Sequence, residues 1–183
     1  MFVFLAVSAA SGVISAGNLI ASGVTLYEEW TLSVDLQFPF NSIPDWSNVL
    51  ILQGLSLDGT VGYRIPAVFM GSSFDPNIHV MNHVNGDWNH ETDLGFVGTD
   101  WFTLTIEQRD IGNQGNYSTF MYAVFIDGNK VYELENWWTN VWKNVDVWIA
   151  GDSRTGSQGA HTYGSSVGHY NNFLLRTINC ELD

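Results

Sequence analysis

Apolar and polar residues alternate along several short stretches of the chain, as they do in a β-strand with one buried and one solvated face. The clearest stretch is residues 30–38, where every second side chain is tryptophan, leucine, valine or phenylalanine. Further extended stretches are expected at residues 48–53, 62–70, 77–82, 101–108, 145–150 and 173–178. No stretch keeps the 3.6-residue period of a capped helix, so the pattern predicts an all-β protein.

Residues 119–135 are expected to form a β-hairpin around which the rest of the chain is built. Two runs rich in valine, isoleucine, phenylalanine and tyrosine flank Asp127, Gly128 and Asn129. Residues of these types accept the positive φ angles that a tight hairpin turn requires. A two-stranded hairpin is only marginally stable alone, so a second layer must cover its apolar face. With turn signals between about ten short strands, the prediction is an antiparallel sandwich or barrel.

The first 23 residues differ from the rest of the chain in composition. An apolar run at residues 1–7 precedes a tether of small residues up to residue 23, so we divide the chain into residues 1–23, an arm and tether, and residues 24–183, a sandwich. The arm resembles a signal peptide but lacks its positive charges, and we expect it to be retained. It is shorter than the roughly 20 apolar residues of a membrane span. Residues 8–23 extend to roughly 50 Å, enough to reach a neighbouring subunit, whereas the alternative is an edge strand in the same domain.

Charge and cysteine content narrow the classes of partner. Six lysines and arginines against 19 aspartates and glutamates give a net charge of −13, which repels nucleic acids and anionic lipid surfaces. The same field attracts cations such as Ca²⁺, although it also simply maintains solubility. Cys180 is the single cysteine, so no disulfide forms within the chain. Asn116 begins an Asn-Tyr-Ser sequon and is a candidate glycosylation site in a secreted protein.

The order of several segments resembles a known family. The succession EWTLSVDLQF, WSNVLILQG, GYRIPAVFM, NIHVMNHVNG, WFTLTIEQ, YAVFIDGNKVYELEN and VDVWIAGD is similar to the concanavalin A-like, laminin G-type jelly rolls of extracellular proteins. The resemblance covers most of residues 29–177. It implies two curved antiparallel sheets, an extracellular location and a concave face that holds sugars or partner proteins in many relatives.

The enzymes of this family carry a Glu-x-Asp-x-Glu run, and its nearest counterpart here is incomplete. Glu133 and Glu135 share a strand face about 7 Å apart, but Leu134 replaces the aspartate and no third carboxylate follows. A glycosidase needs two carboxylates whose pKa values are driven apart. We therefore expect no enzymatic activity.

Acidic and histidine side chains raise two metal hypotheses. The double-metal pattern of legume lectins is not recognisable, and no cofactor is expected to be required. Asp87, Glu91 and Asp93 could supply oxygen ligands to Ca²⁺ from one loop, or be a solvated acidic segment. His79, His83 and His90 do not suit Zn²⁺, because histidines four residues apart on a strand are separated by about 13 Å.

Three tryptophans after the hairpin are the candidate sugar-binding residues. Indole rings stack on sugars and are costly to expose, so Trp137, Trp138 and Trp142 are candidates if they line the concave face. The alternative is that at least two of them plug the edge of the sandwich or a subunit contact.

Three functions remain open at this point. The favoured one is an extracellular structural module that polymerises head to tail, because only this gives the apolar arm a purpose. The inserted residues would be Phe2, Val3, Phe4, Leu5 and Val7. The alternative is a carbohydrate-binding, lectin-like module, and a glycosidase comes third.

Overall fold

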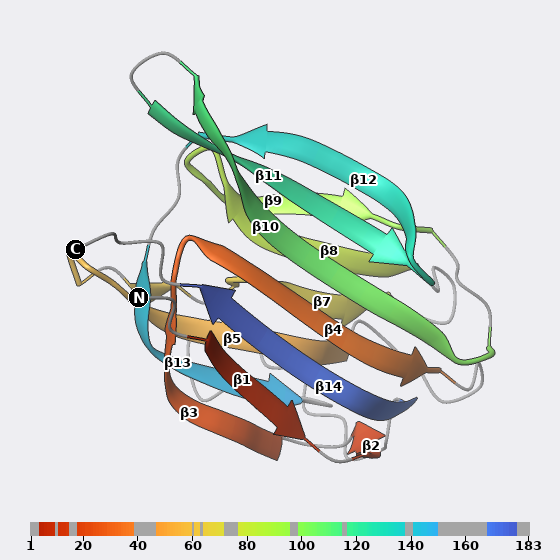
Figure 1. Cartoon of the computed structure of the whole chain (residues 1–183). Helices are drawn as coiled ribbons and strands as arrows, with labels where there is room; N and C mark the ends of the chain where they lie inside the picture. Colours follow the sequence, from red (N-terminus) through yellow and green to blue (C-terminus); the bar gives the residue numbers. More distant parts are fainter. Residues whose placement is uncertain are drawn as a thin grey trace.

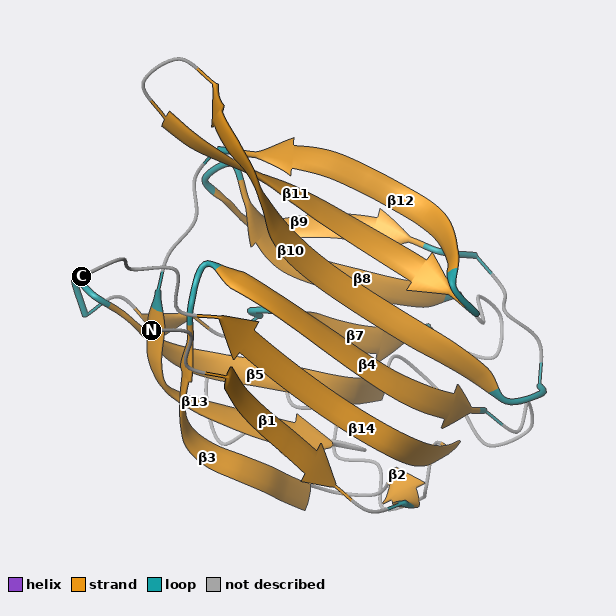
Figure 2. Cartoon of the chain, in the orientation of Figure 1, coloured by secondary structure: helices purple, strands orange, loops and turns teal. Residues whose placement is uncertain are grey.

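The protein is built from two antiparallel β-sheets packed face to face (Figure 1). The computed structural model describes residues 4–9, 11–14, 18–38, 47–59, 61–62, 64–71, 77–95, 99–114, 117–137, 141–149 and 168–178. Within these ranges the chain consists of strands joined by turns and loops (Figure 2). The expected all-β fold of two antiparallel sheets is therefore confirmed. None of the described residues belongs to a helix long and apolar enough to cross a bilayer.

Seven strands of the described chain make up each sheet. Sheet A contains, in spatial order, β1 (Phe4–Ala9), β14 (Gly168–Ile178), β4 (Glu29–Gln37), β10 (Phe102–Gln114), β11 (Tyr117–Ile126) and β12 (Asn129–Asn136), with β2 (Gly12–Ile14) also paired to β14. Sheet B contains β3 (Asn18–Leu26), β13 (Trp142–Ile149), β5 (Ser47–Ser56), β7 (Ala67–Met70), β8 (Ile78–Val84) and β9 (Asp87–Asp93), with β6 (Val61–Gly62) paired to β5.

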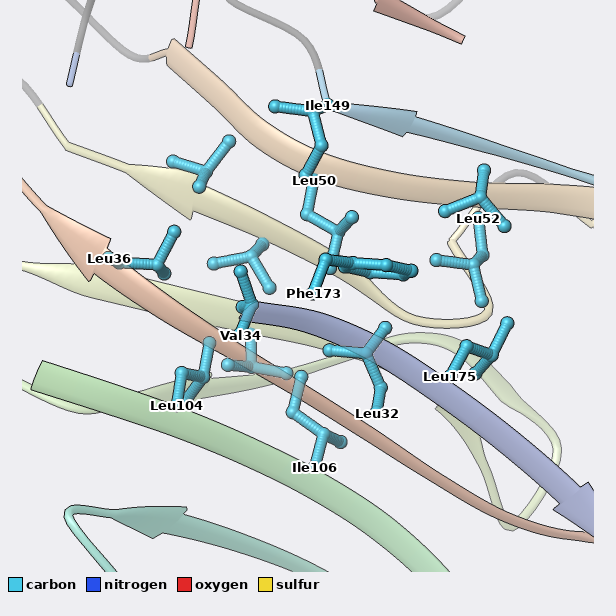
Figure 3. Packing of buried hydrophobic residues seen from close by; sticks show 14 of the residues in the cluster. Leu32, Val34, Leu36, Leu50, Leu52, Leu104, Ile106, Ile149, Phe173 and Leu175 are labelled. Atoms are coloured by element: carbon cyan, nitrogen blue, oxygen red, sulfur yellow. The ribbon is translucent and has the colours of Figure 1, made fainter. Parts of the chain in front are cut away.

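The hydrophobic core lies between the two sheets and follows the alternation of the sequence. Side chains of β4 alternate between half-buried and buried along the whole strand, so its apolar face is completely covered. Leu32 and Leu104 of sheet A face Leu50 and Ile149 of sheet B, and all four are fully buried (Figure 3). Full burial of an aliphatic side chain of this size stabilises the fold by about 1.5 to 3 kcal/mol. The alternating pattern thus supplies the contact that holds the sheets together.

The hairpin at residues 119–135 is confirmed as β11 and β12. Asp127 and Gly128 form its turn with φ angles of 50° and 76°, both in the left-handed region. The aspartate also fixes the turn to β10, because its Oδ1 accepts a 2.8 Å hydrogen bond from the backbone N–H of Thr103. The turn chemistry read from the sequence therefore produces the observed register.

The N-terminal segment does not leave the domain, and this corrects the assembly hypothesis. β1 pairs with β14 of its own chain, from Phe4 opposite Ile178 to Ala9 opposite Phe173. Phe4, Leu5 and Val7 thus lie on the edge of their own sheet, and Phe2 and Val3 lie outside the described residues. An unpaired β14 would leave a row of backbone groups exposed, which the first strand satisfies locally. The segment assigned as a tether likewise contributes β2 and β3 to the two sheets.

Sheet B differs from the sequence prediction in two places. Asp87, Glu91 and Asp93 are expected in one loop or in a solvated acidic segment, but Asp87–Asp93 forms the edge strand β9. The stretch 62–70 was read as one extended run, but it is divided between β6 and β7 around Pro66. Proline has no N–H to donate to a ladder, and here its carbonyl accepts a 2.9 Å hydrogen bond from Leu52 N–H instead.

Candidate functional site

A second, smaller apolar cluster lies on the outer face of sheet B, away from the core. Ile51, Ala67 and Phe69 form this cluster, and Met81 packs against it. Ile51 pairs with Ala67, and Ala67 pairs with Met81, so the four residues come from adjacent strands. Ile51 and Ala67 are fully buried although they do not belong to the core. We call these four residues the floor of the site.

Arg64 lies directly over this floor. Its guanidinium carbon is 5.4 Å from the centre of the Phe69 ring, and its Nη1 donates to the Met81 sulfur at 3.0 Å. Burial lowers the pKa of Arg64, and the nearby Glu91 carboxylate partly offsets that effect by raising the pKa. A cation held against an aromatic ring and partly desolvated is well placed to attract an anionic or hydroxyl-rich ligand.

His79 and Glu91 complete the group. His79 Nδ1 lies 2.7 Å from Glu91 Oε1, and the His79 side chain is 5 % exposed whereas the Glu91 side chain is 44 % exposed. An ionised carboxylate only accepts hydrogen bonds, so Nδ1 is the donor in this pair. We call these three residues the Arg64–His79–Glu91 group. It combines a cation, an oriented imidazole and an accessible carboxylate.

Trp148 adds a hydrogen-bond donor to the same face. Val147 and Ile149 on either side of it point into the core, so Trp148 points outward, and it pairs with Ile51 of the floor. Its indole N–H is buried and has no hydrogen-bond partner among the described residues. A buried donor without an acceptor is costly to stability.

The three candidate tryptophans do not form one surface. Trp137 is 61 % exposed, whereas Trp142 is 4 % exposed and belongs to the core. Gly62 makes room for the Trp142 ring, because a Cβ atom at this glycine would lie 2.5 Å from it. Trp138 lies outside the described residues. The expectation that Trp142 lines a binding surface is thus corrected, because its indole fills the interior.

The acidic residues proposed for Ca²⁺ lie along a strand rather than around a loop. Asp87, Glu91 and Asp93 all belong to β9, where residues four apart are separated by about 13 Å. Glu91 bonds to His79, and Asp93 accepts a 2.8 Å hydrogen bond from Gly95 N–H. In the part of the chain that the structure describes, no group of three histidine, cysteine, aspartate or glutamate side chains is arranged to hold a metal ion.

The remaining candidates lie apart from one another. The His83 ring packs edge-on against the Trp142 ring, with their ring centres 6.0 Å apart. His90 hydrogen-bonds through Nε2 to the Tyr132 hydroxyl at 2.7 Å. Glu133 forms an exposed ion pair with Lys130 on β12, the edge strand of sheet A. Asn116 lies outside the described residues, so its glycosylation stays a prediction.

Comparison with known proteins identifies the fold. No protein-family model and no curated protein sequence matches the chain. Among solved structures, a variant of alginate lyase Aly36B in complex with an alginate tetrasaccharide matches with a TM-score of 0.56 and 17 % identity over 98 % of this chain and 82 % of the lyase. A SAP-like pentraxin from Limulus polyphemus matches with a TM-score of 0.53 and 10 % identity over 94 % of this chain and 75 % of the pentraxin. Alginate lyase vAL-1 from Chlorella virus matches with a TM-score of 0.51 and 11 % identity over 93 % of this chain and 88 % of the lyase. The chain is therefore a jelly-roll sandwich, and the jelly-roll fold that the resemblance implies is confirmed.

The expectation that the chain is not an enzyme is wrong, because the reasoning behind it does not exclude other classes of enzyme. It depended on the missing Glu-x-Asp-x-Glu run, yet two of the structures that share this fold are polysaccharide lyases. A jelly roll of this shape therefore carries catalysis in proteins other than glucanases. The absence of a glucanase pattern consequently excludes only one kind of enzyme.

Proposed function

We propose that the chain binds a glycan on the outer face of sheet B. The observation that carries this proposal is the Arg64–His79–Glu91 group, in which Arg64 lies over the Phe69 ring and His79 contacts the Glu91 carboxylate. Sugars present hydroxyl groups at their rim and apolar C–H groups on their faces, so they suit a site that mixes charged groups with an aromatic floor.

The half-buried Arg64 favours a glycan that contains uronate units. Arg64 is the cation in this group, and partial burial disfavours its charge. A ligand carboxylate would compensate that loss through a charge-assisted, bidentate contact. The net charge of −13 repels polyanions at long range, so binding must depend on this local contact and is expected to weaken as salt screens it. The alginate lyases among the similar structures add support for this ligand class.

Cleavage of the bound glycan is the second candidate function, and the His79–Glu91 pair favours it. In a β-elimination, a base removes the proton next to the uronate carboxylate, a carbon–carbon double bond forms as the C–O bond to the leaving sugar breaks, and the leaving oxygen takes a proton from water. Glu91, whose carboxylate is 44 % exposed, supplies the base, His79 positions it through the 2.7 Å contact with Nδ1, and Arg64 stabilises the uronate carboxylate during proton removal.

An extracellular location is part of this proposal. Large polysaccharides lie outside cells, and the apolar N-terminal run and the Asn116 sequon are typical of secreted proteins. Detection of the native protein in the medium or cell wall fraction would support this location, and retention in the cytoplasm would contradict it.

Titration calorimetry with alginate, glucuronan and neutral glucan oligosaccharides tests binding. We expect the uronate oligosaccharides to bind more tightly than the neutral one, and Arg64→Gln to remove that preference. Glu133→Gln is the matched control, because it changes an exposed charge on sheet A. Equal affinity of wild type and Arg64→Gln for every oligosaccharide would overturn the assignment of the site.

A second assay separates cleavage from binding. Alginate and glucuronan are incubated with the protein, and the new double bond is followed by its ultraviolet absorbance. If the chain is a lyase, absorbance rises and Glu91→Gln abolishes the rise while Arg64-dependent binding persists. No rise above the buffer control, with binding intact, would leave the chain as a binding module.

A further inference from the structure

Trp137 exposes a large indole at one end of the sandwich, directly after β12. Its exposed fraction is 61 %, the highest among the described tryptophans, and Trp101 follows with 48 %. An exposed indole leaves a large apolar face in water, and tryptophan is enriched at binding surfaces because its ring packs while its N–H finds a hydrogen-bond partner. Trp137 is not part of the Arg64–His79–Glu91 group.

The backbone beside Trp137 is fixed by the turn between β8 and β9. Asn85 and Gly86 occupy this turn with φ angles of 52° and 82°, as expected for an Asn-Gly hairpin. Asn85 Oδ1 accepts a 2.9 Å hydrogen bond from Trp137 N–H, and Asn85 Nδ2 donates to the Glu135 carbonyl at 2.8 Å. The Asn85 backbone N–H donates to Asn136 Oδ1 at 2.9 Å. Three hydrogen bonds therefore hold residues 135–137 against sheet B.

A buried amide continues this connection into sheet A. Asn136 is fully buried, and its Nδ2 donates to Gln108 Oε1 at 2.9 Å. Gln108 in turn donates through Nε2 to the Glu28 carbonyl at 2.5 Å. We call Asn85, Asn136 and Gln108 the amide network. The amide groups of this network hydrogen-bond to one another and to backbone groups of both sheets. They therefore fix the Trp137 backbone before any ligand arrives, which reduces the conformational entropy lost on binding.

We propose that Trp137 is a second saccharide contact, on which a pyranose ring stacks, and that Asn85 and Asn136 are positioning residues for it. This rests on the proposed function in so far as the ligand is a glycan. Glu135, two residues before Trp137, and Asp87, two residues after Asn85, are exposed carboxylates, which accept hydrogen bonds from hydroxyl groups and repel phosphates. A single ring among carboxylates is too small for a stable protein interface, which buries about 1,200 to 2,000 Å² in total.

The indole N–H signal of Trp137 in a ¹⁵N–¹H spectrum is the direct test. The protein has eight tryptophans, and Trp137→Phe identifies the signal by its disappearance. We expect this signal to shift on addition of alginate, glucuronan or neutral glucan oligosaccharides, whereas the Trp101 signal stays in place. A Trp137 signal that does not move at ligand concentrations that saturate binding would overturn the proposal.

Affinity measurements on variants distinguish this proposal from the proposed function. Trp137→Ala is expected to weaken binding of long oligosaccharides about three- to tenfold, and Trp101→Ala to leave it unchanged. Loss of binding in Arg64→Gln with no effect of Trp137→Ala would overturn the second contact only. Weaker binding in Trp137→Ala with no effect of Arg64→Gln would overturn the site on sheet B only. Asn85→Ala is expected to weaken binding of long oligosaccharides while leaving that of short ones unchanged, and an equal loss for both lengths would contradict the positioning role.

Discussion

Replacing Asn136 by alanine should destabilise the fold far more than the loss of one small polar side chain suggests. The side chain is fully buried, accepts from Asn85 N–H and donates to Gln108 Oε1. Asn136→Ala removes the amide that accepts from Asn85 N–H and donates to Gln108 Oε1, so the Gln108 oxygen stays buried without this donor. A buried polar group left unsatisfied costs about 1 to 3 kcal/mol, and the partly buried Asn85 N–H adds a smaller cost. We therefore expect a loss of about 2 to 4 kcal/mol in the free energy of unfolding.

Urea unfolding followed by circular dichroism measures this loss. For a chain of this length it corresponds to a decrease in melting temperature of about 4 to 16 °C. Glu135→Ala is the control, because its side chain is exposed and only its carbonyl joins the network, so its effect should stay within about 0.5 kcal/mol. If Asn136→Ala costs no more than this control, the amide network does not hold the two sheets together.

Asn136→Asp tests the direction of the hydrogen bonds. The introduced carboxyl keeps the acceptor for Asn85 but, when ionised, faces the Gln108 oxygen in a buried site. Burial should raise its pKa in the folded state, so the folded protein binds a proton that the unfolded chain has lost. Stability of this variant should then fall as pH rises above about 4, the ordinary aspartate value. If the free energy of unfolding of Asn136→Asp depends on pH in the same way as that of the wild type, the Asn136 amide does not donate to Gln108 Oε1.

Three further predictions follow from single contacts. Gly168→Ala places a Cβ atom 2.5 Å from the Gln37 carbonyl oxygen, so it should lower the free energy of unfolding by about 1 to 3 kcal/mol in urea titrations, and an unchanged midpoint would contradict this packing. Burial lowers the pKa of His83, and Asp87 has a smaller opposing effect. Below about pH 6.5 the unfolded chain therefore binds a proton that the folded chain does not, so the free energy of unfolding should decrease as the pH is lowered through this range. His83→Gln should flatten that pH dependence in calorimetry, and an unchanged dependence would contradict the assignment to His83. Deletion of residues 1–9 uncovers the edge of β14 and should lower the melting temperature and promote association in sedimentation experiments, whereas a monomer of unchanged stability would mean that β1 contributes nothing to the sheet.

The sequence predicted the architecture well where one face of a strand is buried and the other solvated. β4 shows this, because alternation alone specifies which residues point inward. The turn at Asp127 and Gly128 was predictable from residue type. The Asn85-Gly86 turn carries an equally strong hairpin signal, but the polar composition of β9 concealed the second strand. An edge strand needs few apolar residues, so composition is a poor guide there.

The candidate site was much less predictable than the fold. His79 and Glu91 are twelve residues apart, and only the antiparallel pairing of β8 with β9 brings them to 2.7 Å. Arg64 reaches this group from the loop before β7, and no local pattern indicates that it will lie over Phe69. The role of the N-terminal run was misassigned because length and hydrophobicity show how far a strand can reach, whereas the free edge of β14 decides where it pairs.

Mapping a bound oligosaccharide onto the backbone by NMR tests the central claim most directly. An alginate or glucuronan oligosaccharide is titrated into the ¹⁵N-labelled protein, and shift changes are assigned along both sheets. The account predicts that the largest changes fall on Arg64, Phe69, His79 and Glu91 of sheet B. Changes confined to β10 and β11 of sheet A, or none at any oligosaccharide concentration, would contradict it.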